Sequence, residues 1–409
     1  MLLNPDSIWD RLISVGESPL TERDRGLTAA LVASLADDVP APFAVRRLGP
    51  LPSLSHDETA ADTGVPAERD FGEHVDQTNY SVVVSDRVVV KWLTPPAPLP
   101  HPAPDVLAHL AASGFQEIAP PYAALTLREK SGAPGAAGPA ETAGAAGGGE
   151  VLLALVTGYL PEARDGWEWC VDEAEAGRTS FARDLGRLTA DLHVALSTFR
   201  PPAPSPEAAD PAGTAGPHDG DGDPSRYGAR AEQALREALA LTDGEDGAWL
   251  ATREAALRQE LEPLHRPLGS TPLIRIHGDL HVGQILRWRD GYAVIDFDGN
   301  PTVTGAEPYQ PAARDVAQLA TSLEHVAQVA VRRRGTPPEH AARWARETRA
   351  AMLSAYRRHL AERGRPDLLD EALLRPFEVE QECRELVYAA RHLPRWRYAP
   401  MGVLRTWYP

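Results

Sequence analysis

Residues 274–301 read IRIHGDLHVGQILRWRDGYAVIDFDGNP, which places two histidines, four acidic residues and a glutamine among short apolar runs. Two of these runs, 285–288 and 292–295, flank the pair Asp290-Gly291, a strong signal for a tight β-hairpin. Folding this hairpin is expected to bring Gln284 roughly opposite Asp296. Asp279 lies five residues before Gln284, on the loop that enters the hairpin.

The oxygen-bearing side chains at the open end of this hairpin indicate phosphoryl-transfer chemistry. One amide oxygen and one carboxylate, from Gln284 and Asp296, are ligands that Mg²⁺ accepts when substrate phosphates and waters complete its shell. A carboxylate on the preceding loop, that of Asp279, can accept a proton from an attacking hydroxyl. Such a site works mostly by positioning and by neutralising charge.

Two other interpretations of the same stretch stay open at this point. His277 and His281 are four residues apart, as in a helical zinc site, but HGDLH lacks the Glu after the first His, and its glycine is unfavourable in a helix. Alternatively, the polar residues belong to a satisfied loop without chemistry, which is the better interpretation for any single Asp or His. The joint spacing of three such residues favours a phosphotransfer site.

Composition excludes several classes of function. The chain has 409 residues, enough for two or three domains, and Asp and Glu outnumber Lys and Arg by 58 to 41, a formal charge of −17. This excess of negative charge argues against nucleic acid and anionic membranes as partners. The two cysteines are too few for a disulfide framework, and neither an apolar leader nor a run near the ~20 residues of a membrane helix occurs. We therefore expect a cytoplasmic, monomeric protein.

The order of the remaining elements predicts a small β-rich region followed by a larger helical one. Two low-complexity stretches, 131–149 and 200–224, are expected to be surface loops. The expected domains are an N-terminal cap at 1–77, a small lobe at 78–160 and a helical lobe at 161–409. The expected elements are helices over 7–35 with a break near 16–19, a hairpin over 78–93, a helix in 102–115 that ends at Gly114, a strand over 151–156, and helices over 181–196 and 377–396.

The motifs HGDLHVGQIL and IDFDG closely resemble the catalytic and metal-binding loops of aminoglycoside phosphotransferase-like kinases. The resemblance implies an α+β, two-lobed protein-kinase-like fold and the use of ATP and Mg²⁺, one ion or two. It implies Asp279 as catalytic base, Gln284 and Asp296 as metal ligands, and Asp298 near a second metal or the acceptor. Glutamine at 284, where most of the superfamily has asparagine, is typical of the maltokinase-like branch.

The same resemblance assigns further residues. Lys91 is similar to the strand lysine that holds ATP phosphates, Asp105 stands where an acid pairs with it, Thr78 lies in the segment that replaces a glycine-rich loop, and Thr157 to Tyr159 resemble the adenine-binding hinge. In PAARDVAQLA, Arg314-Asp315 resembles the segment that braces the catalytic loop, and His277 is grouped with it as structural support. His193 is interpreted as a buried packing residue.

The acceptor is also an expectation from resemblance. DFDGNP and the segment that follows are more similar to actinobacterial glucosamine kinases than to maltokinases, which implies phosphorylation of hydroxyl 6 of D-glucosamine. Maltose, an aminoglycoside, or a catalytically silent kinase-fold binding module are the alternatives. The candidate acceptor-site residues are Asp279, Asp298, Gln310, Glu382, Glu385 and Trp396, the last on an aromatic-rich tail able to stack on a sugar ring.

Overall fold

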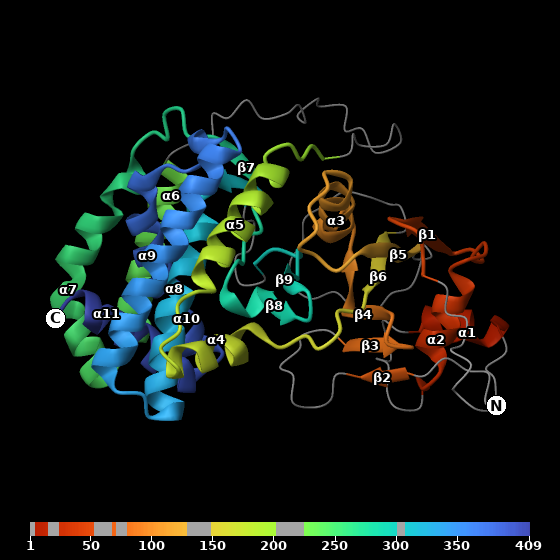
Figure 1. The fold of residues 1–409 in the computed structure, drawn as a ribbon, viewed down its shortest axis with the longest axis horizontal. Helices are drawn as coiled ribbons and strands as arrows, with labels where there is room; N and C mark the ends of the chain where they lie inside the picture. The colour runs from red at the N-terminus through yellow and green to blue at the C-terminus, as the bar shows by residue number, and fades with distance from the viewer. Residues whose placement is uncertain are drawn as a thin grey trace. The chain divides into compact units, whose positions relative to one another are not determined.

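The structure is a computed structural model that describes residues 5–14, 24–52, 68–70, 80–128, 149–201, 225–300 and 307–409. The chain divides into two compact units, Met1–Glu162 and Ala163–Pro409. The first is built on a sheet and the second is mainly helical (Figure 1). The predicted α+β class, with a sheet-rich part before a helical part, is confirmed. No helix among the described residues combines the length and the apolarity needed to cross a membrane.

The first unit contains a six-stranded sheet of order β1-β5-β6-β4-β3-β2, in which every neighbouring pair is antiparallel. Apolar residues of the two N-terminal helices share one core with the sheet, and Trp92 donates its indole N–H to Thr28 at 3.2 Å. The elements are α1 Pro5–Ile13, α2 Leu27–Ser34, β1 Phe43–Arg47, β2 Glu68–Asp70, β3 Tyr80–Val84, β4 Val88–Pro98, α3 Pro102–Ala112, β5 Pro121–Arg128 and β6 Glu150–Gly158.

The second unit is a helical body with two small β-structures. Helix α8 is buried along almost its whole length because α4, α9, α10 and α11 all pack against it. The elements are α4 Gly166–Glu175, α5 Ala182–Leu196, α6 Ser225–Leu241, α7 Gly244–Leu261, β7 Leu273–Arg275, β8 Ile285–Trp288, β9 Gly291–Val294, β10 Tyr309–Pro311, α8 Ala313–Val329, η5 Ala330–Arg334, α9 Pro338–Glu362, α10 Leu374–Arg391 and α11 Tyr398–Trp407, with short turns η3 Glu262–His265, η4 Val282–Gln284, η6 Pro366–Leu368, η7 Glu371–Leu373 and η8 Pro394–Trp396.

Most predicted elements are confirmed, and their ends differ where local chemistry intervenes. The helix expected to end at Gly114 ends at Ala112, since Gly114 adopts φ +80°. The helix expected over 377–396 ends at Arg391, and Pro394 begins a separate short turn that carries Trp396. The predicted break near 16–19 and most of the two low-complexity stretches lie outside the described residues.

The hairpin is present, but its register differs from the prediction by one residue. Strands β8 and β9 pair Ile285 with Val294, and the N–H of Ile295 donates to the carbonyl of Gln284 at 3.0 Å. Gln284 therefore lies opposite Ile295, and Asp296 follows one residue beyond. There the backbone leaves the ladder, because Asp296 has a left-handed φ of +67°.

Close packing of α5 on α9 leads to a test of the helical unit. A Cβ on Gly186 would lie 2.2 Å from the carbonyl oxygen of Met352 and 2.8 Å from Ala355 Cβ. We expect Gly186→Ala to lower the free energy of unfolding by about 1–3 kcal/mol, the usual cost of overpacking. Urea denaturation measures it. The neighbouring exposed Arg187→Ala should stay within about 0.5 kcal/mol of wild type, and a stabilised Gly186→Ala protein would contradict the packing.

Candidate active site

The loop between β7 and η4 is held by one buried carboxylate. Asp315, in the first turn of α8, accepts the backbone N–H of His277 at 2.7 Å on Oδ2 and that of Gly278 at 2.9 Å on Oδ1. Gly278 adopts φ +88°, a conformation that suits glycine. Asp315 itself is fully buried, so the loop backbone satisfies a charge that would otherwise be costly to desolvate.

His193 of α5 completes the surroundings of Asp315. Its Nε2 lies 3.3 Å from Asp315 Oδ2, and its Nδ1 lies 2.7 Å from the hydroxyl of the equally buried Tyr356. Burial alone raises the pKa of Asp315, but the hydrogen bond with His193 and the N–H of Gly278 help to lower it below its ordinary value. The expected burial of His193 is confirmed, and the structure adds that His193 contacts Asp315, the residue that holds the loop.

One face of α8 contacts the loop at successive points. Three residues further along the helix than Asp315, Gln318 donates its amide to Asp279 Oδ1 at 2.7 Å. Four residues further again, Ser322 accepts the N–H of Val282 at 3.0 Å. Sequence reasoning did not single out Gln318 or Ser322, although their spacing of three and seven residues from Asp315 places all three on one helix face.

Asp279 is held on one of its two oxygens. Its Oδ1 accepts the amide of Asn300 at 2.9 Å as well as that of Gln318, while its Oδ2 lies 3.8 Å from Nε2 of His281. The side chain of Asp279 remains 17% exposed. The predicted base is thus oriented by two amides on Oδ1, and no described residue donates a hydrogen bond to Oδ2.

His277 connects the loop to the hairpin. Its Nδ1 accepts the N–H of Asp279 at 3.3 Å, so its Nε2 carries the proton that is donated to the carbonyl of Ile295 at 2.9 Å. Asp279 and the residue before Asp296 are therefore joined through a single imidazole. This contact, together with the ladder bond at Gln284, brings the three residues of the predicted site to one end of the hairpin.

The oxygen donors at this end fit a magnesium ion better than a metal bound by protein alone. Among the described residues, no three His, Cys, Asp or Glu side chains gather into a metal site. Asp296 is exposed, whereas Gln284 and Asp298 are half-buried. An amide and carboxylates with open faces are what Mg²⁺ accepts when phosphates and waters supply its other ligands.

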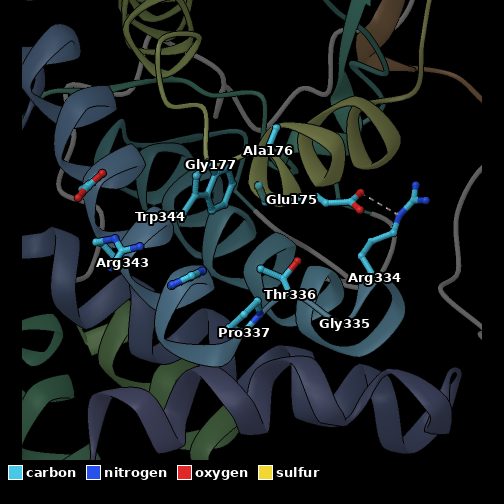
Figure 2. Close-up of a pocket in the computed structure, with 12 residues that line it drawn as sticks. Glu175, Ala176, Gly177, Arg334, Gly335, Thr336, Pro337, Arg343 and Trp344 are labelled. Atoms are coloured by element: carbon cyan, nitrogen blue, oxygen red, sulfur yellow. Dashed lines mark ion pairs between the residues drawn. The ribbon is translucent and has the colours of Figure 1, made fainter.

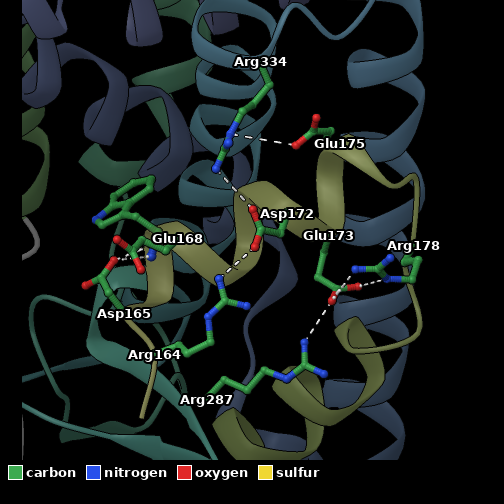
Figure 3. Close-up of polar contacts among 10 residues, drawn as sticks. Arg164, Asp165, Glu168, Asp172, Glu173, Glu175, Arg178, Arg287 and Arg334 are labelled. Atoms are coloured by element: carbon green, nitrogen blue, oxygen red, sulfur yellow. Dashed lines mark hydrogen bonds and ion pairs between the residues drawn. The ribbon is translucent and has the colours of Figure 1, made fainter. Parts of the chain in front are cut away.

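Helix α4 supports the hairpin from one side (Figure 3). Arg287 of β8 donates to Glu173 of α4 at 2.9 Å, and Arg178 donates to the same carboxylate at 2.8 Å. The hydrogen bonds from Arg178 and Arg287 outweigh burial and lower the pKa of Glu173. Trp169 also donates its indole N–H to the carbonyl of Ile285 at 2.9 Å. Strand β8 of the hairpin is therefore fixed to a helix.

Three aromatic side chains, those of Trp167, His281 and Trp396, lie together beside the loop that carries Asp279. Trp167 of α4 stacks on the His281 ring with centroids 5.7 Å apart, and Trp396 meets Trp167 edge-on at 5.6 Å. Trp396 donates its indole N–H to Glu385 Oε2 at 2.8 Å. The structure thus brings the predicted residues Glu385 and Trp396 together, and connects them to the loop through Trp167, which sequence reasoning missed.

Glu382 has a different environment from Glu385, one turn away on α10. Its carboxylate is fully buried and lies 2.9 Å from Nε2 of His325 on α8. Burial raises the pKa of Glu382 to about 7 against the opposing charge of His325. Burial lowers the pKa of His325, but the charge and hydrogen bond of Glu382 reverse this and raise it. Glu382 and His325 therefore form a buried pair inside the helical unit.

The remaining predicted residues of this unit have structural contacts. Arg314 is buried, not on the surface, and donates to both oxygens of Glu380 at 2.9 and 3.1 Å while its guanidinium lies 4.6 Å from the ring centre of Phe377. Gln310 of β10 is buried and donates to the carbonyl of Glu307 at 2.7 Å. Its Oε1 has no hydrogen-bond partner among the described residues.

In the first unit, the predicted nucleotide-binding residues lie on and beside the sheet. Lys91 is half-buried on β4, between Ser81 of β3 and Leu155 of β6 in the register. Asp105 of α3 accepts a hydrogen bond from Arg46 of β1, a partner that sequence reasoning did not foresee. Thr78 lies outside the described residues.

Two backbone N–H groups at the expected hinge already donate hydrogen bonds within the first unit. The N–H of Gly158, which follows Thr157 at the end of β6, donates to the carbonyl of Pro120 at 2.8 Å, and that of Tyr159 donates to Arg87 at 2.9 Å. These two donors are therefore used within the sheet. An adenine contact at this hinge needs other backbone groups.

A pocket of about 380 Å³ lies elsewhere in the helical unit, where the end of α4 faces the start of α9 (Figure 2). Its lining includes the Trp344 ring, the glycines at 177 and 335, and charged groups of both signs, among them Glu175 and Arg334, which lie 3.8 Å apart. None of the residues predicted for phosphotransfer lines it. The loop chemistry is therefore separate from this pocket.

Comparisons with known proteins agree with the geometry. The model of a phosphotransferase enzyme family matches residues 69–299. A glucosamine kinase of Streptacidiphilus jiangxiensis is 38% identical over 379 residues, covering 87% of this chain and 77% of that protein. One of Mycolicibacterium smegmatis (strain ATCC 700084 / mc(2)155) is 34% identical over 344 residues, covering 81% and 77%. A solved glucosamine kinase in complex with glucosamine, ADP and inorganic phosphate is 35% identical, covers 94% of this chain and 83% of that chain, and has a TM-score of 0.69.

The hydrogen bonds that Asp315 accepts from the backbone of His277 and Gly278 predict a stability that depends on pH. Asp315→Asn turns an amide N–H toward backbone donors, so we expect the free energy of unfolding at neutral pH to fall by about 2–4 kcal/mol. The pKa of Asp315 is lowered from 3.8 on folding, so its stabilisation is present above about pH 4 and is lost as pH falls through the folded-state value. The difference between wild type and variant should therefore shrink below about pH 4.

Urea unfolding over a pH series measures this difference. Asp290→Asn, in the exposed hairpin turn, serves as the control because it removes the same charge where asparagine fits equally well. A constant difference at every pH would contradict the assigned role of Asp315.

Proposed function

Because the chain belongs to the phosphotransferase enzyme family, we propose that it transfers the γ-phosphoryl group of ATP to hydroxyl 6 of D-glucosamine. The observation that carries the proposal is the likeness to a solved glucosamine kinase with bound glucosamine and ADP, over 94% of this chain. The loop geometry around Asp279 supports the reaction class independently of that name.

Asp279 is the general base in this proposal. The oxygen of hydroxyl 6 attacks the γ-phosphorus, the bond from that phosphorus to the bridging oxygen breaks with its electron pair leaving on ADP, and the hydroxyl proton goes to the carboxylate of Asp279. His277 and Asp315 fix the loop backbone so that this carboxylate stays in place. Positioning of this kind is the main contribution of a protein to phosphoryl transfer.

Gln284 and Asp296 supply the oxygen ligands for Mg²⁺, with Asp298 available for a second ion or for the acceptor. When bound, Mg²⁺ neutralises charge on the phosphates. Lys91 holds ATP phosphates as a point charge, assisted by Thr78. The backbone from Thr157 to Tyr159 receives the adenine through groups other than the N–H of Gly158 and of Tyr159, which are bonded within the sheet. Asp105, which already pairs with Arg46, supports the nucleotide site indirectly.

Glu385 and Trp396 are the acceptor-binding residues in best position among the candidates. Trp396 offers a ring for stacking on a sugar, and Glu385 is a half-buried carboxylate that is held beside it. Glu382 is fully buried against His325 and has a supporting role. Asp298 and Gln310 are the further candidates for the ammonium and hydroxyl groups of glucosamine.

The base assignment predicts a separation of binding from turnover. Asp279→Asn should lower kcat by about 10²- to 10⁴-fold, the usual contribution of a general base, while the Kd for MgATP stays within about threefold because the metal ligands are other residues. A coupled ADP assay and isothermal titration measure the two quantities. Residual kcat close to wild type would remove Asp279 from the mechanism.

The acceptor assignment predicts a selective loss. Glucosamine carries an ammonium group near neutral pH, and a carboxylate binds it by a charge-assisted hydrogen bond. Glu385→Gln keeps an oxygen for Trp396 but removes the charge, so we expect kcat/KM for glucosamine to fall about 30-fold, roughly 2 kcal/mol, with glucose much less affected. Asp298→Asn tests the competing carboxylate. Equal effects on glucosamine and glucose in both variants, or efficient phosphorylation of maltose or N-acetylglucosamine by the wild type, would contradict the assignment.

A further inference from the structure

We propose that Gln318 is a positioning residue that fixes which oxygen of Asp279 takes up the acceptor's proton. The proposal rests on the proposed phosphotransfer and adds that the two oxygens of Asp279 have different roles: Oδ1 accepts hydrogen bonds and Oδ2 takes up the proton. It follows from the contacts of Asp279, which are unequal on its two sides.

Oδ1 is occupied by hydrogen bonds. It accepts the Gln318 amide at 2.7 Å and the Asn300 amide at 2.9 Å, from two segments that approach from α8 and from the loop after β9. Two donors in different directions use the accessible lone pairs of this oxygen. They also prevent rotation of the carboxylate about its Cβ–Cγ bond, because turning it breaks both hydrogen bonds.

Oδ2 remains open. His281 accepts the N–H of Gly283 on Nδ1 at 3.0 Å, and its Nε2 lies 3.8 Å from Asp279 Oδ2, which is beyond hydrogen-bond distance. Among the residues that the structure describes, none donates a hydrogen bond to Oδ2. Oδ2 is therefore the oxygen that receives the proton of the attacking hydroxyl.

Gln318 is suited to this role by its burial. It is only 4% exposed and lies in the middle of a helix that is packed on several sides. It shares its helix face with Asp315, which holds the backbone of the same loop. A rigid helix thus sets both the position of the loop and the rotation of its reactive side chain. Asn300, next to residues outside the described ranges, adds the second amide.

The test compares Gln318→Leu with Gln328→Leu. Gln328 lies on the same helix, with its amide beside Gly402 of α11, and serves as the control for loss of an amide from α8. We expect Gln318→Leu to lower kcat about 10²-fold, the loss typical of a misplaced catalytic group. KM for ATP and for glucosamine should stay within about threefold, since neither substrate loses a contact. Gln328→Leu should keep wild-type kcat.

A double-mutant cycle then separates positioning from structure. In the Asp279→Asn background the base is already absent, so adding Gln318→Leu should lower kcat no further. A full additional loss in that background would overturn the proposal, as would a Gln318→Leu effect that appears only in KM or a kcat equal to wild type. Circular dichroism and urea unfolding of each variant confirm that folded proteins are compared.

The proposed acceptor fails separately from this inference. If the wild type phosphorylates a different sugar, the glucosamine assignment is wrong and the cycle is measured with that sugar. If it phosphorylates none of glucosamine, glucose, maltose and kanamycin, the cycle is measured on ATP hydrolysis, in which water gives its proton to the same base. In each case a kcat effect of Gln318→Leu that vanishes in the Asp279→Asn background supports the role of Gln318, and one that persists overturns it.

Discussion

The carboxylate of Asp315 is the constraint on which the helical unit's active-site geometry depends. A fully buried charge must be paired or hydrogen-bonded, because desolvating it alone is very unfavourable. Here the partners are two backbone N–H groups of the catalytic loop and the ring of His193. If the loop moved, the buried carboxylate of Asp315 would lose its hydrogen bonds. Because that loss is costly, the loop is held in one position.

Helix α8 extends this constraint from one contact to a surface. Asp315, Gln318 and Ser322 lie on one face and contact the loop at His277, Asp279 and Val282 in turn. A helix that is packed against four others offers less freedom than a loop, so side chains that it holds keep fixed directions. The hairpin receives comparable support from α4 through its ion pair with Arg287. The side chains proposed for the reaction thus lie on the loop and at the end of the hairpin, while α8 and α4 fix their orientation.

The net charge of the chain and the environments of its individual carboxylates have different consequences for binding. A formal charge of −17 disfavours anionic partners at long range, so the proposed ATP site would depend on local cations, for which Lys91 and Mg²⁺ are the candidates. The same excess suits a cationic sugar. Within the helical unit, carboxylates one turn apart on α10 differ in environment: Glu382 is buried with His325, whereas Glu385 holds Trp396 and stays half-buried. The burial of each carboxylate, more than its presence, decides which one can meet a substrate.

The amino-acid sequence by itself determined the order of a sheet-rich region before a helical one, the hairpin, and the closeness of Asp279, Gln284 and Asp296 at one end of that hairpin. These features are local: turn chemistry and strand periodicity act over a few residues, and the motif spacings are short. Only the tertiary structure decided that Gln318 and Asn300 hold one oxygen of Asp279, since 39 residues separate Gln318 from Asp279. It also decided the pairing of Asp105 with Arg46, the one-residue change in the hairpin register, and the burial of Glu382. These features depend on how segments that are distant in the sequence pack together. The sequence pattern of an acidic residue on a helix is the same whether its carboxylate faces a histidine or a substrate, so the pattern cannot distinguish the two cases.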